Sequence, residues 1–200
     1  MSPRVILASA SPRRRELLSV IVPEFDVEPA DVDESAWNNQ PLRSGVTGAA
    51  MAKALRIAEA HPDDVVIGAD TIVTVIGQAL GKPASPAEAA EMLRMLSGRE
   101  HTVMTGLAVV SRLRTESVVE ESRVQFAPLT EEQIRAYVRT GEPMDKAGAY
   151  GIQGRASAFI ERVEGCYFNI VGLPLFRLAA LLPLHGVTPW KLWEPDGREP

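Results

Sequence analysis

The 200-residue sequence predicts a mixed α/β fold with α+β elements, organised as two lobes around a central cleft. Two observations carry this prediction. Apolar runs typical of strands alternate with helical patterns along the chain, as in β/α units. Two long β-rich runs, at about 102–112 and 117–126, follow one another and predict an antiparallel pair. This combination of β/α units with an antiparallel insertion is what favours two lobes.

The first half of the chain is predicted to begin with β/α elements. Ser11 and Pro12 mark the start of its first helix, because serine is a good N-cap and proline suits the first helical position. In order, we expect a strand at 4–9, a helix at 12–20, an extended stretch at 24–29, a helix at 46–60, and a strand at 65–69 continued by 72–76.

Two capping boxes mark helices in the second half. Ser85 precedes Glu88, and Thr130 precedes Gln133, at the spacing that satisfies two backbone N–H groups reciprocally. The expected elements are a loop at 77–83, a helix at 86–96, the antiparallel pair, a helix at 131–139, a glycine-rich loop at 145–154, a strand at 158–163 and a helix at 175–184.

Composition predicts one domain over residues 1–188 and a weakly ordered polar tail over 189–200. The single cysteine, Cys166, excludes an internal disulfide and suits a reducing compartment. There is no apolar run of about 18 residues and no secretory signal pattern, so we expect a cytoplasmic protein without a membrane partner. The net charge of −5 argues against nucleic-acid binding by the whole molecule, so a phosphate ligand needs a local basic cluster.

Such a cluster opens the first predicted helix. Arg13, Arg14 and Arg15 follow the N-cap Ser11 directly, where unpaired N–H groups and the helix dipole already favour anions. The pattern predicts a site for a phosphate-bearing ligand. The alternative is an ordinary solvated basic turn, and this segment alone does not separate the two.

Asp70 and Thr71 continue the apolar strand 65–69. A carboxylate at the end of a strand can hold Mg²⁺ or Mn²⁺ or accept a proton from water, although such an aspartate is more often a turn former. Thr71 can donate a hydrogen bond to a phosphate or a base, or be a plain strand residue. Asp33 and Glu34 offer adjacent carboxylates for a divalent cation, or form a solvated acidic loop.

Three lysines, Lys53, Lys82 and Lys146, lie in separate segments from which they can converge on a triphosphate. Lys82 is the strongest candidate because Gly81 and Pro83 flank it, whereas a helical Lys53 is as readily a surface residue. The loop 145–154 carries three glycines, which suggests close approach of the backbone to a ligand.

Gln153 stands in this loop. Its amide has a donor and an acceptor that match the N3–H and O4 edge of uracil or thymine. The sequence lacks the P-loop and dinucleotide-binding glycine patterns, which argues against those classes of nucleotide protein.

Five separated motifs together resemble the Maf family of nucleoside triphosphate pyrophosphatases, in the family's order, from Arg4 to about Leu184. They are residues 9–18 (SASPRRRELL), 68–73 (GADTIV), 81–83 (GKP), 145–154 (DKAGAYGIQG) and 171–175 (VGLPL). The match favours the subfamily that acts on dTTP and UTP. The sister subfamily that acts on 7-methyl-GTP resembles the chain less, because it tends to have a bulky aromatic residue in place of Arg13.

The resemblance implies a fold related to the inosine triphosphate pyrophosphatases, often a homodimer, and hydrolysis to monophosphate and pyrophosphate with a divalent cation, Mg²⁺ or Mn²⁺. It also implies tolerance of pyrimidine nucleotides modified at C5. By position it assigns Asp70 as proton acceptor, and Arg13, Thr71 and Gln153 to specificity. With less certainty it links Glu34, Lys53 and Lys82 to metal or phosphate handling.

The predicted mechanism is metal-assisted attack of water on the α-phosphorus. Asp70 and Lys82 are the catalytic candidates, and Glu34 and Asp70 the metal ligands. Substrate binding is assigned to Arg13, Arg14, Thr71, Gln153, Ser11, Lys53 and Lys146. Two alternatives of other classes are a non-enzymatic regulator of septum formation, which the family resemblance suggests, and a nucleic-acid-binding module, which the overall acidity disfavours.

Overall fold

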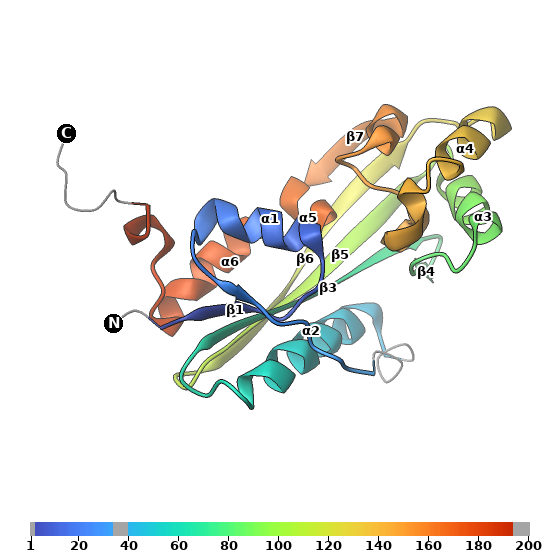
Figure 1. Cartoon of the computed structure of the whole chain (residues 1–200). Helices are drawn as coiled ribbons and strands as arrows, with labels where there is room; N and C mark the ends of the chain where they lie inside the picture. The colour runs from blue at the N-terminus through green and yellow to red at the C-terminus, as the bar shows by residue number, and fades with distance from the viewer. Residues whose placement is uncertain (1–2, 34–39, 194–200) are drawn as a thin grey trace, which may run out of the picture. The chain divides into compact units, whose positions relative to one another are not determined.

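The structure is a computed structural model that describes residues 3–33 and 40–193 (Figure 1). Within these residues, seven strands form a mixed sheet in the order β2-β1-β3-β5-β6-β7, with β4 paired to β3. The predicted mixed α/β fold is therefore confirmed. The strands are β1 (Val5–Leu7), β2 (Asp26–Val27), β3 (Val65–Val75), β4 (Gln78–Leu80), β5 (Glu100–Val110), β6 (Thr115–Phe126) and β7 (Ile160–Gly165).

Helices and short 3₁₀ turns connect these strands. The α-helices are α1 (Pro12–Ile21), α2 (Leu42–Ala58), α3 (Pro86–Leu96), α4 (Glu131–Val138), α5 (Tyr167–Val171) and α6 (Leu175–Leu181). The 3₁₀ turns are η2 (Glu142–Asp145), η3 (Ala147–Ala149), η4 (Arg155–Phe159), η5 (Leu182–His185) and η6 (Pro189–Lys191).

The chain divides into two compact units. Unit 1 comprises residues 1–70, 106–120 and 172–200, and unit 2 comprises residues 71–105 and 121–171. The long strands β3, β5 and β6 contribute residues to both. The predicted division into two parts is thus observed, whereas the cleft stays a prediction. The first passage of the chain from unit 1 into unit 2 is the peptide bond between Asp70 and Thr71.

Unit 1 is a parallel β/α arrangement. β1 pairs in parallel with both β2 and β3, with Leu7 opposite Ile67 in the pairing with β3. Helix α2 lies on one side of these strands, and α1 and α6 lie on the other (Figure 1). Leu7, Leu18, Ile67 and Leu178 are fully buried, as expected when parallel strands are covered on both faces.

In unit 2 the structure differs from the predicted loop at 77–83. β3 turns back at Ile76 and Gly77, which have φ values of 45° and 78°, and β4 pairs antiparallel with its end. Two consecutive residues with positive φ form the turn that suits a two-residue hairpin. This turn could not be predicted from the sequence, because β-branched residues such as isoleucine rarely adopt positive φ.

Helices α3 and α4 begin at the predicted caps. Thr130 and Gln133 form the full capping box. The Ser85 hydroxyl accepts from the N–H of Glu88, but the Glu88 carboxylate accepts from the N–H of Ala84 rather than from that of Ser85. The two helices pack against each other within unit 2.

An aromatic cluster fills part of the unit 2 core. Phe126 and Tyr150 meet edge to face with ring centroids 4.9 Å apart, and His101 makes the same kind of contact with each. The Tyr150 hydroxyl and His101 Nε2 lie 2.8 Å apart. Burial lowers the pKa of His101 from 6.5 to about 4, so this imidazole is neutral at pH 7.

Three further segments differ from the predicted elements. Helix α2 begins at Leu42 rather than at 46. The predicted helix at 175–184 ends as an α-helix at Leu181, because Pro183 cannot continue the hydrogen-bond ladder, and η5 follows. Helix α5 has only five residues and carries no cap signal that sequence reasoning detects.

Part of the predicted C-terminal tail is described by the structure. Residues 189–191 form η6, and the Trp193 indole N–H donates to the Ile21 carbonyl at 3.0 Å. Residues 194–200 lie outside the described residues, and the boundary at 188 stays a prediction. None of the helices in the described part of the chain combines the length and hydrophobicity that a membrane span requires.

Candidate functional site

Unit 1 contains an ion pair between two of the predicted site residues. The Nζ atom of Lys53 on α2 lies 2.7 Å from Oδ1 of Asp70 on β3. Only 11% of the Lys53 side chain and 17% of the Asp70 side chain are exposed. Burial of a single charge is costly, so each charge compensates the other. Of the two alternatives left open for Lys53, the surface residue is excluded, because Lys53 belongs to the buried face of α2.

Two glycines explain how Lys53 reaches this position. A Cβ atom on Gly68 would lie 2.2 Å from the Ala50 carbonyl oxygen, and one on Gly106 would lie 2.3 Å from that of Val46. The backbone of α2 therefore approaches β3 and β5 more closely than any side chain permits. Lys53 follows Ala50 by three residues, on the same face of the helix, and this places its ammonium group over the strand that carries Asp70.

The start of α1 lies at the carboxyl end of the neighbouring strand. The Ala8 N–H donates to the Ile67 carbonyl at 2.8 Å, so the turn after β1 runs beside the stretch of β3 that leads to Asp70. In α/β sheets, ligands commonly bind at the carboxyl ends of parallel strands. The prediction that Asp70 ends a strand is wrong, because β3 runs without interruption from Val65 to Val75 and Asp70 lies within it.

Ser11 caps α1 as predicted, with its hydroxyl accepting from the N–H of Arg14 at 3.4 Å. The Arg14 side chain also stabilises the surrounding loops. Its Nε donates to the Gly172 carbonyl at 2.9 Å and its Nη1 to the Ser9 hydroxyl at 3.1 Å. Sequence reasoning missed this architectural role of Arg14. Arg13, one position earlier, is half-buried.

In unit 2 the structure brings two predicted motifs together. The Gly148 N–H donates to the Gly81 carbonyl at 3.0 Å, which joins the Lys82 loop to the glycine-rich loop. Gly148 has a φ of 69°, and a Cβ atom there would lie 2.9 Å from the Val73 side chain. Glycine is therefore required at this crossing. Lys82 is exposed beside it.

Glu142 braces the second part of the glycine-rich loop. Its Oε1 accepts from the Tyr137 hydroxyl at 3.0 Å, and its Oε2 accepts from the Arg155 N–H at 3.2 Å. A Cβ atom on Gly154 would lie 2.0 Å from Oε1, so the loop closes tightly over this carboxylate. Gln153 is exposed on this braced loop. Sequence reasoning did not single out Glu142 or Tyr137.

Lys146 is held within the same loop. Its Nζ donates to the Glu142 carbonyl at 2.6 Å and to the Asp145 carboxylate at 2.5 Å, and its stem lies against Gly151. These contacts give Lys146 a role in shaping the loop. Its predicted contact with phosphate stays a prediction.

Thr71, the first residue of unit 2, contacts a second threonine. Its Oγ1 lies 2.9 Å from that of Thr105, whose hydroxyl also donates to the Asn169 carbonyl at 3.0 Å. Thr105 and Asn169 are buried, and sequence reasoning did not single them out. The sequence indicates their burial only weakly: Thr105 lies in a strand rich in apolar residues, and Asn169 lies between Phe168 and Ile170.

Glu34, one of the two predicted metal ligands, lies outside the described residues. Its neighbour Asp33 is exposed. Among residues 3–33 and 40–193, no group of three or more histidine, cysteine, aspartate or glutamate side chains could hold a metal ion. Of the two predicted ligands, the described residues include Asp70.

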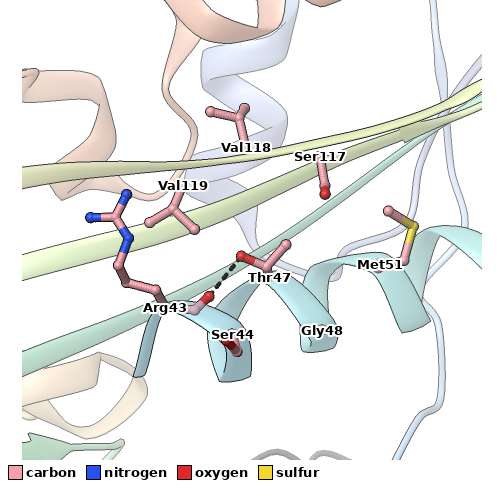
Figure 2. Close-up of a pocket in the computed structure, with 8 residues that line it drawn as sticks. All are labelled: Arg43, Ser44, Thr47, Gly48, Met51, Ser117, Val118 and Val119. Atoms are coloured by element: carbon pink, nitrogen blue, oxygen red, sulfur yellow. Dashed lines mark hydrogen bonds between the residues drawn. The ribbon is translucent and has the colours of Figure 1, made fainter. Parts of the chain in front are cut away.

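A pocket of about 530 Å³ lies elsewhere in unit 1, between α2 and β6. Figure 2 shows Arg43, Thr47 and Met51 of the helix facing Ser117 and Val119 of the strand. None of the predicted site residues lines it. We assign it no role, because nothing that lines it belongs to the motifs of the predicted site.

The chain matches the family model described as Maf-like protein over residues 4–184. It is 51% identical over 189 residues to the dTTP/UTP pyrophosphatase of Moorella thermoacetica, covering 94% of this chain and 97% of the relative. The protein of the same name from Symbiobacterium thermophilum is 51% identical over 183 residues, covering 92% and 94%. Among solved structures, the Staphylococcus aureus Ham1 protein shares the fold, with a TM-score of 0.54 at 16% identity over 90% of this chain and 98% of that one.

Proposed function

Since this chain belongs to the Maf-like protein family, we propose that it is a nucleoside triphosphate pyrophosphatase that hydrolyses dTTP and UTP to the monophosphate and pyrophosphate. The observation that carries this proposal is the similarity to relatives named dTTP/UTP pyrophosphatase, at 51% identity over nearly their whole length. The Lys53–Asp70 ion pair supports it, because a carboxylate held in place on a strand is suited to proton transfer or cation binding.

In this proposal Asp70 acts on the attacking water. It accepts the proton as water adds to the α-phosphorus and pyrophosphate leaves, or it holds the cation that acidifies the water. Lys53 fixes the orientation of the Asp70 carboxylate through the contact of 2.7 Å. Both roles require Asp70 to be a carboxylate, so its amide variant tests them together.

The phosphate charges are assigned to basic groups and to the N-terminus of α1. Arg13, Arg14 and the N–H groups that follow Ser11 neutralise charge that builds on the phosphates in the transition state. Lys82 acts in the same way from its exposed position beside Gly81, and Lys146 supports the loop next to it. Positioning and charge stabilisation account for most of phosphoryl-transfer catalysis.

Base recognition is assigned to Gln153 and Thr71. The Gln153 amide matches the N3–H and O4 edge of uracil and thymine. Because this edge lies away from C5, the site is expected to accept nucleotides modified at C5. This expectation fails if 5-methyl-UTP is hydrolysed far more slowly than both UTP and dTTP.

A divalent cation, Mg²⁺ or Mn²⁺, completes the proposal. Such ions at nucleotide sites are held by one or two carboxylates together with phosphates and water. Asp70 offers one carboxylate to a cation that arrives with the triphosphate, and Glu34 stays the second proposed ligand. When bound, the cation would neutralise phosphate charge and lower the pKa of a coordinated water.

The cellular setting belongs to the same proposal. A single cysteine, which suits a reducing compartment, and a nucleotide substrate favour the cytoplasm. A homodimer is the expected assembly, and gel filtration with light scattering measures it directly.

Product analysis tests the proposed function. We would incubate the purified protein and its Asp70→Asn variant with dTTP, UTP, CTP, GTP and 7-methyl-GTP, with Mg²⁺ or Mn²⁺. The expected result is pyrophosphate with dTMP and UMP from the wild type only. Orthophosphate would mean cleavage at the γ-phosphate, and preferred turnover of 7-methyl-GTP would place the chain with the sister subfamily. No turnover of any nucleotide would favour the regulator of septum formation.

A further inference from the structure

The glycine-rich loop of unit 2 ends in a tight turn that carries Gln153. The Gly154 N–H donates to the Gly151 carbonyl at 3.0 Å, which closes a four-residue turn with Gln153 at its third position. The Glu142 side chain lies directly against this turn, because a Cβ atom on Gly154 would lie 2.0 Å from its Oε1. Only 15% of the Glu142 side chain is exposed. The position of the turn therefore depends on the position of this carboxylate.

The two oxygens of the Glu142 carboxylate hold the main chain on the two sides of Gln153. Before Gln153, the Tyr137 hydroxyl accepts from the Gly151 N–H at 3.2 Å and donates to Oε1 at 3.0 Å. After Gln153, the Arg155 N–H donates to Oε2 at 3.2 Å. The two N–H groups belong to the residues two positions before and two positions after Gln153. One carboxylate thus fixes the backbone on both sides of the side chain that is assigned to the base.

The chemistry of these two side chains suits this arrangement. Tyr137 is buried, and its burial raises the pKa of its hydroxyl, with the neighbouring Glu142 carboxylate adding to the rise. The phenol therefore keeps its proton at neutral pH and donates it to Glu142. Both oxygens of Glu142 act as acceptors, which a carboxylate provides and an amide does not, because an amide has only one oxygen.

We propose that Glu142 and Tyr137 are positioning residues for base recognition, because together they hold the turn that carries Gln153. They act through the position of Gln153 and not by contact with the nucleotide. An exposed amide gains most from a hydrogen bond to a base when its backbone is already in place, since otherwise part of the binding free energy is used to order the loop. The inference rests on the proposed function, in which Gln153 reads the edge of uracil and thymine.

The test is steady-state hydrolysis of UTP and GTP by the wild type, Tyr137→Phe, Glu142→Gln and Tyr150→Phe, each with and without Gln153→Ala. Tyr137→Phe removes one hydroxyl and keeps the carboxylate, so it tests the inference even if thermal unfolding shows that Glu142→Gln does not fold. Tyr150→Phe is the matched control. It also removes a buried hydroxyl from the glycine-rich loop, but the partner of that hydroxyl is His101 Nε2 in the core, at 2.8 Å.

In Tyr137→Phe and Glu142→Gln, we expect KM for UTP to rise by about threefold to fivefold with little change in kcat, because only the contact with the base is weakened. KM for GTP should stay nearly constant, so the UTP/GTP ratio of kcat/KM falls by the same factor. In the Gln153→Ala background, neither substitution should lower this ratio further, because the side chain through which it acts is gone. Tyr150→Phe should keep the wild-type ratio.

Three results overturn the inference: a wild-type ratio in Tyr137→Phe, an equal loss of kcat/KM for UTP and GTP, and a fall in the ratio that recurs in full in the Gln153→Ala background. The last two would mean that the substitutions disturb the loop without acting through Gln153. If Gln153→Ala alone keeps the wild-type ratio, the base-reading role fails and the inference fails with it. Failure of the wild type to release pyrophosphate from UTP or dTTP overturns the proposed function instead.

Discussion

The two units hold their functional side chains in different ways. In unit 1 the charged groups stand on regular structure: Lys53 on α2, Asp70 on β3 and Arg14 in the first turn of α1. In unit 2 the candidate residues Lys82 and Gln153 are exposed on loops. Hydrogen bonds of the Glu142 carboxylate and of the Gly148 N–H shape those loops.

This difference separates two tasks. A helix packed on a strand through Gly68 and Gly106 fixes a charge pair rigidly, which suits a chemical step common to every substrate. The loop of unit 2 that carries Gln153 is fixed by Glu142, which accepts from the Tyr137 hydroxyl and from the Arg155 N–H. We therefore expect variants at Asp70 and Lys53 to lower turnover of all nucleotides, and variants at Gln153 to change the ratio of turnover between nucleotides.

The largest effect is expected at Asp70. Asp70→Asn should lower kcat for dTTP and UTP by about 10²–10⁴-fold, because the amide can neither take a proton from water nor hold a cation as a carboxylate does. Pyrophosphate release under saturating substrate measures it. A variant that keeps more than about a tenth of wild-type turnover contradicts the general-base assignment.

Lys53→Met should have the next largest effect. It leaves the Asp70 carboxylate poorly exposed and without the ammonium that lies 2.7 Å away. We expect kcat to fall by about 30-fold to 100-fold equally for dTTP and UTP, and the free energy of unfolding to fall by about 2 kcal/mol. Lys191→Met, at an exposed lysine of the same unit, is the control. A change in the ratio of kcat for dTTP to kcat for UTP would contradict the assignment of Lys53 to a step that all substrates share.

His101 provides a test of the unit 2 core. Its pKa in the folded chain is about 4 against an ordinary 6.5, because burial disfavours the charged imidazole. Between these values the unfolded chain binds a proton that the folded chain does not, so stability is full above pH 6.5 and falls as the pH decreases toward 4. The His101 contribution should amount to about 1.5 kcal/mol between pH 6.5 and pH 5.

Urea unfolding of the wild type and His101→Gln across this pH range measures that contribution. The slope of stability against pH should be smaller in the variant, whatever its absolute stability. Identical slopes would show that the imidazole does not resist protonation in the folded protein.

The smallest effect is expected at Gln153, because its exposed amide competes with water. Gln153→Ala should reduce the preference for UTP over GTP, as a ratio of kcat/KM, by about fivefold, with little change in kcat for UTP. Gln78→Ala, at an exposed glutamine on β4, is the control. If the preference survives in Gln153→Ala, the base-reading role fails.

Local signals explain which parts of the fold could be predicted. The caps at Ser11 and Thr130 act within one helical turn, so sequence reasoning placed α1 and α4 within one residue of their observed starts. The β4 hairpin and α5 lacked such signals. Ile76 adopts a positive φ only because the pairing of β3 with β4 stabilises it, and α5 depends on the side-chain contacts of Asn169.

The candidate site shows the same limit. Motifs identified Asp70, Lys53 and Thr71, but Asp70 and Lys53 contact each other across 17 positions of the chain, and Thr71 contacts Thr105 across 34 positions. Lys53 could not be distinguished from a surface lysine without knowing that α2 packs closely on Gly68. No motif in the sequence marks Glu142 or Thr105. Only the fold shows that Glu142 contacts Tyr137 and Arg155, and that Thr105 contacts Thr71 and Asn169.

Hydrolysis of dTTP in ¹⁸O-labelled water tests the central claim most directly. Water that attacks the α-phosphorus leaves its oxygen on dTMP, and mass spectrometry of the two products shows where the label lies. We predict one ¹⁸O atom in dTMP and none in pyrophosphate. Label in pyrophosphate would mean attack at the β-phosphorus, and dTDP with labelled orthophosphate would mean γ-phosphate cleavage; either result contradicts the proposed reaction.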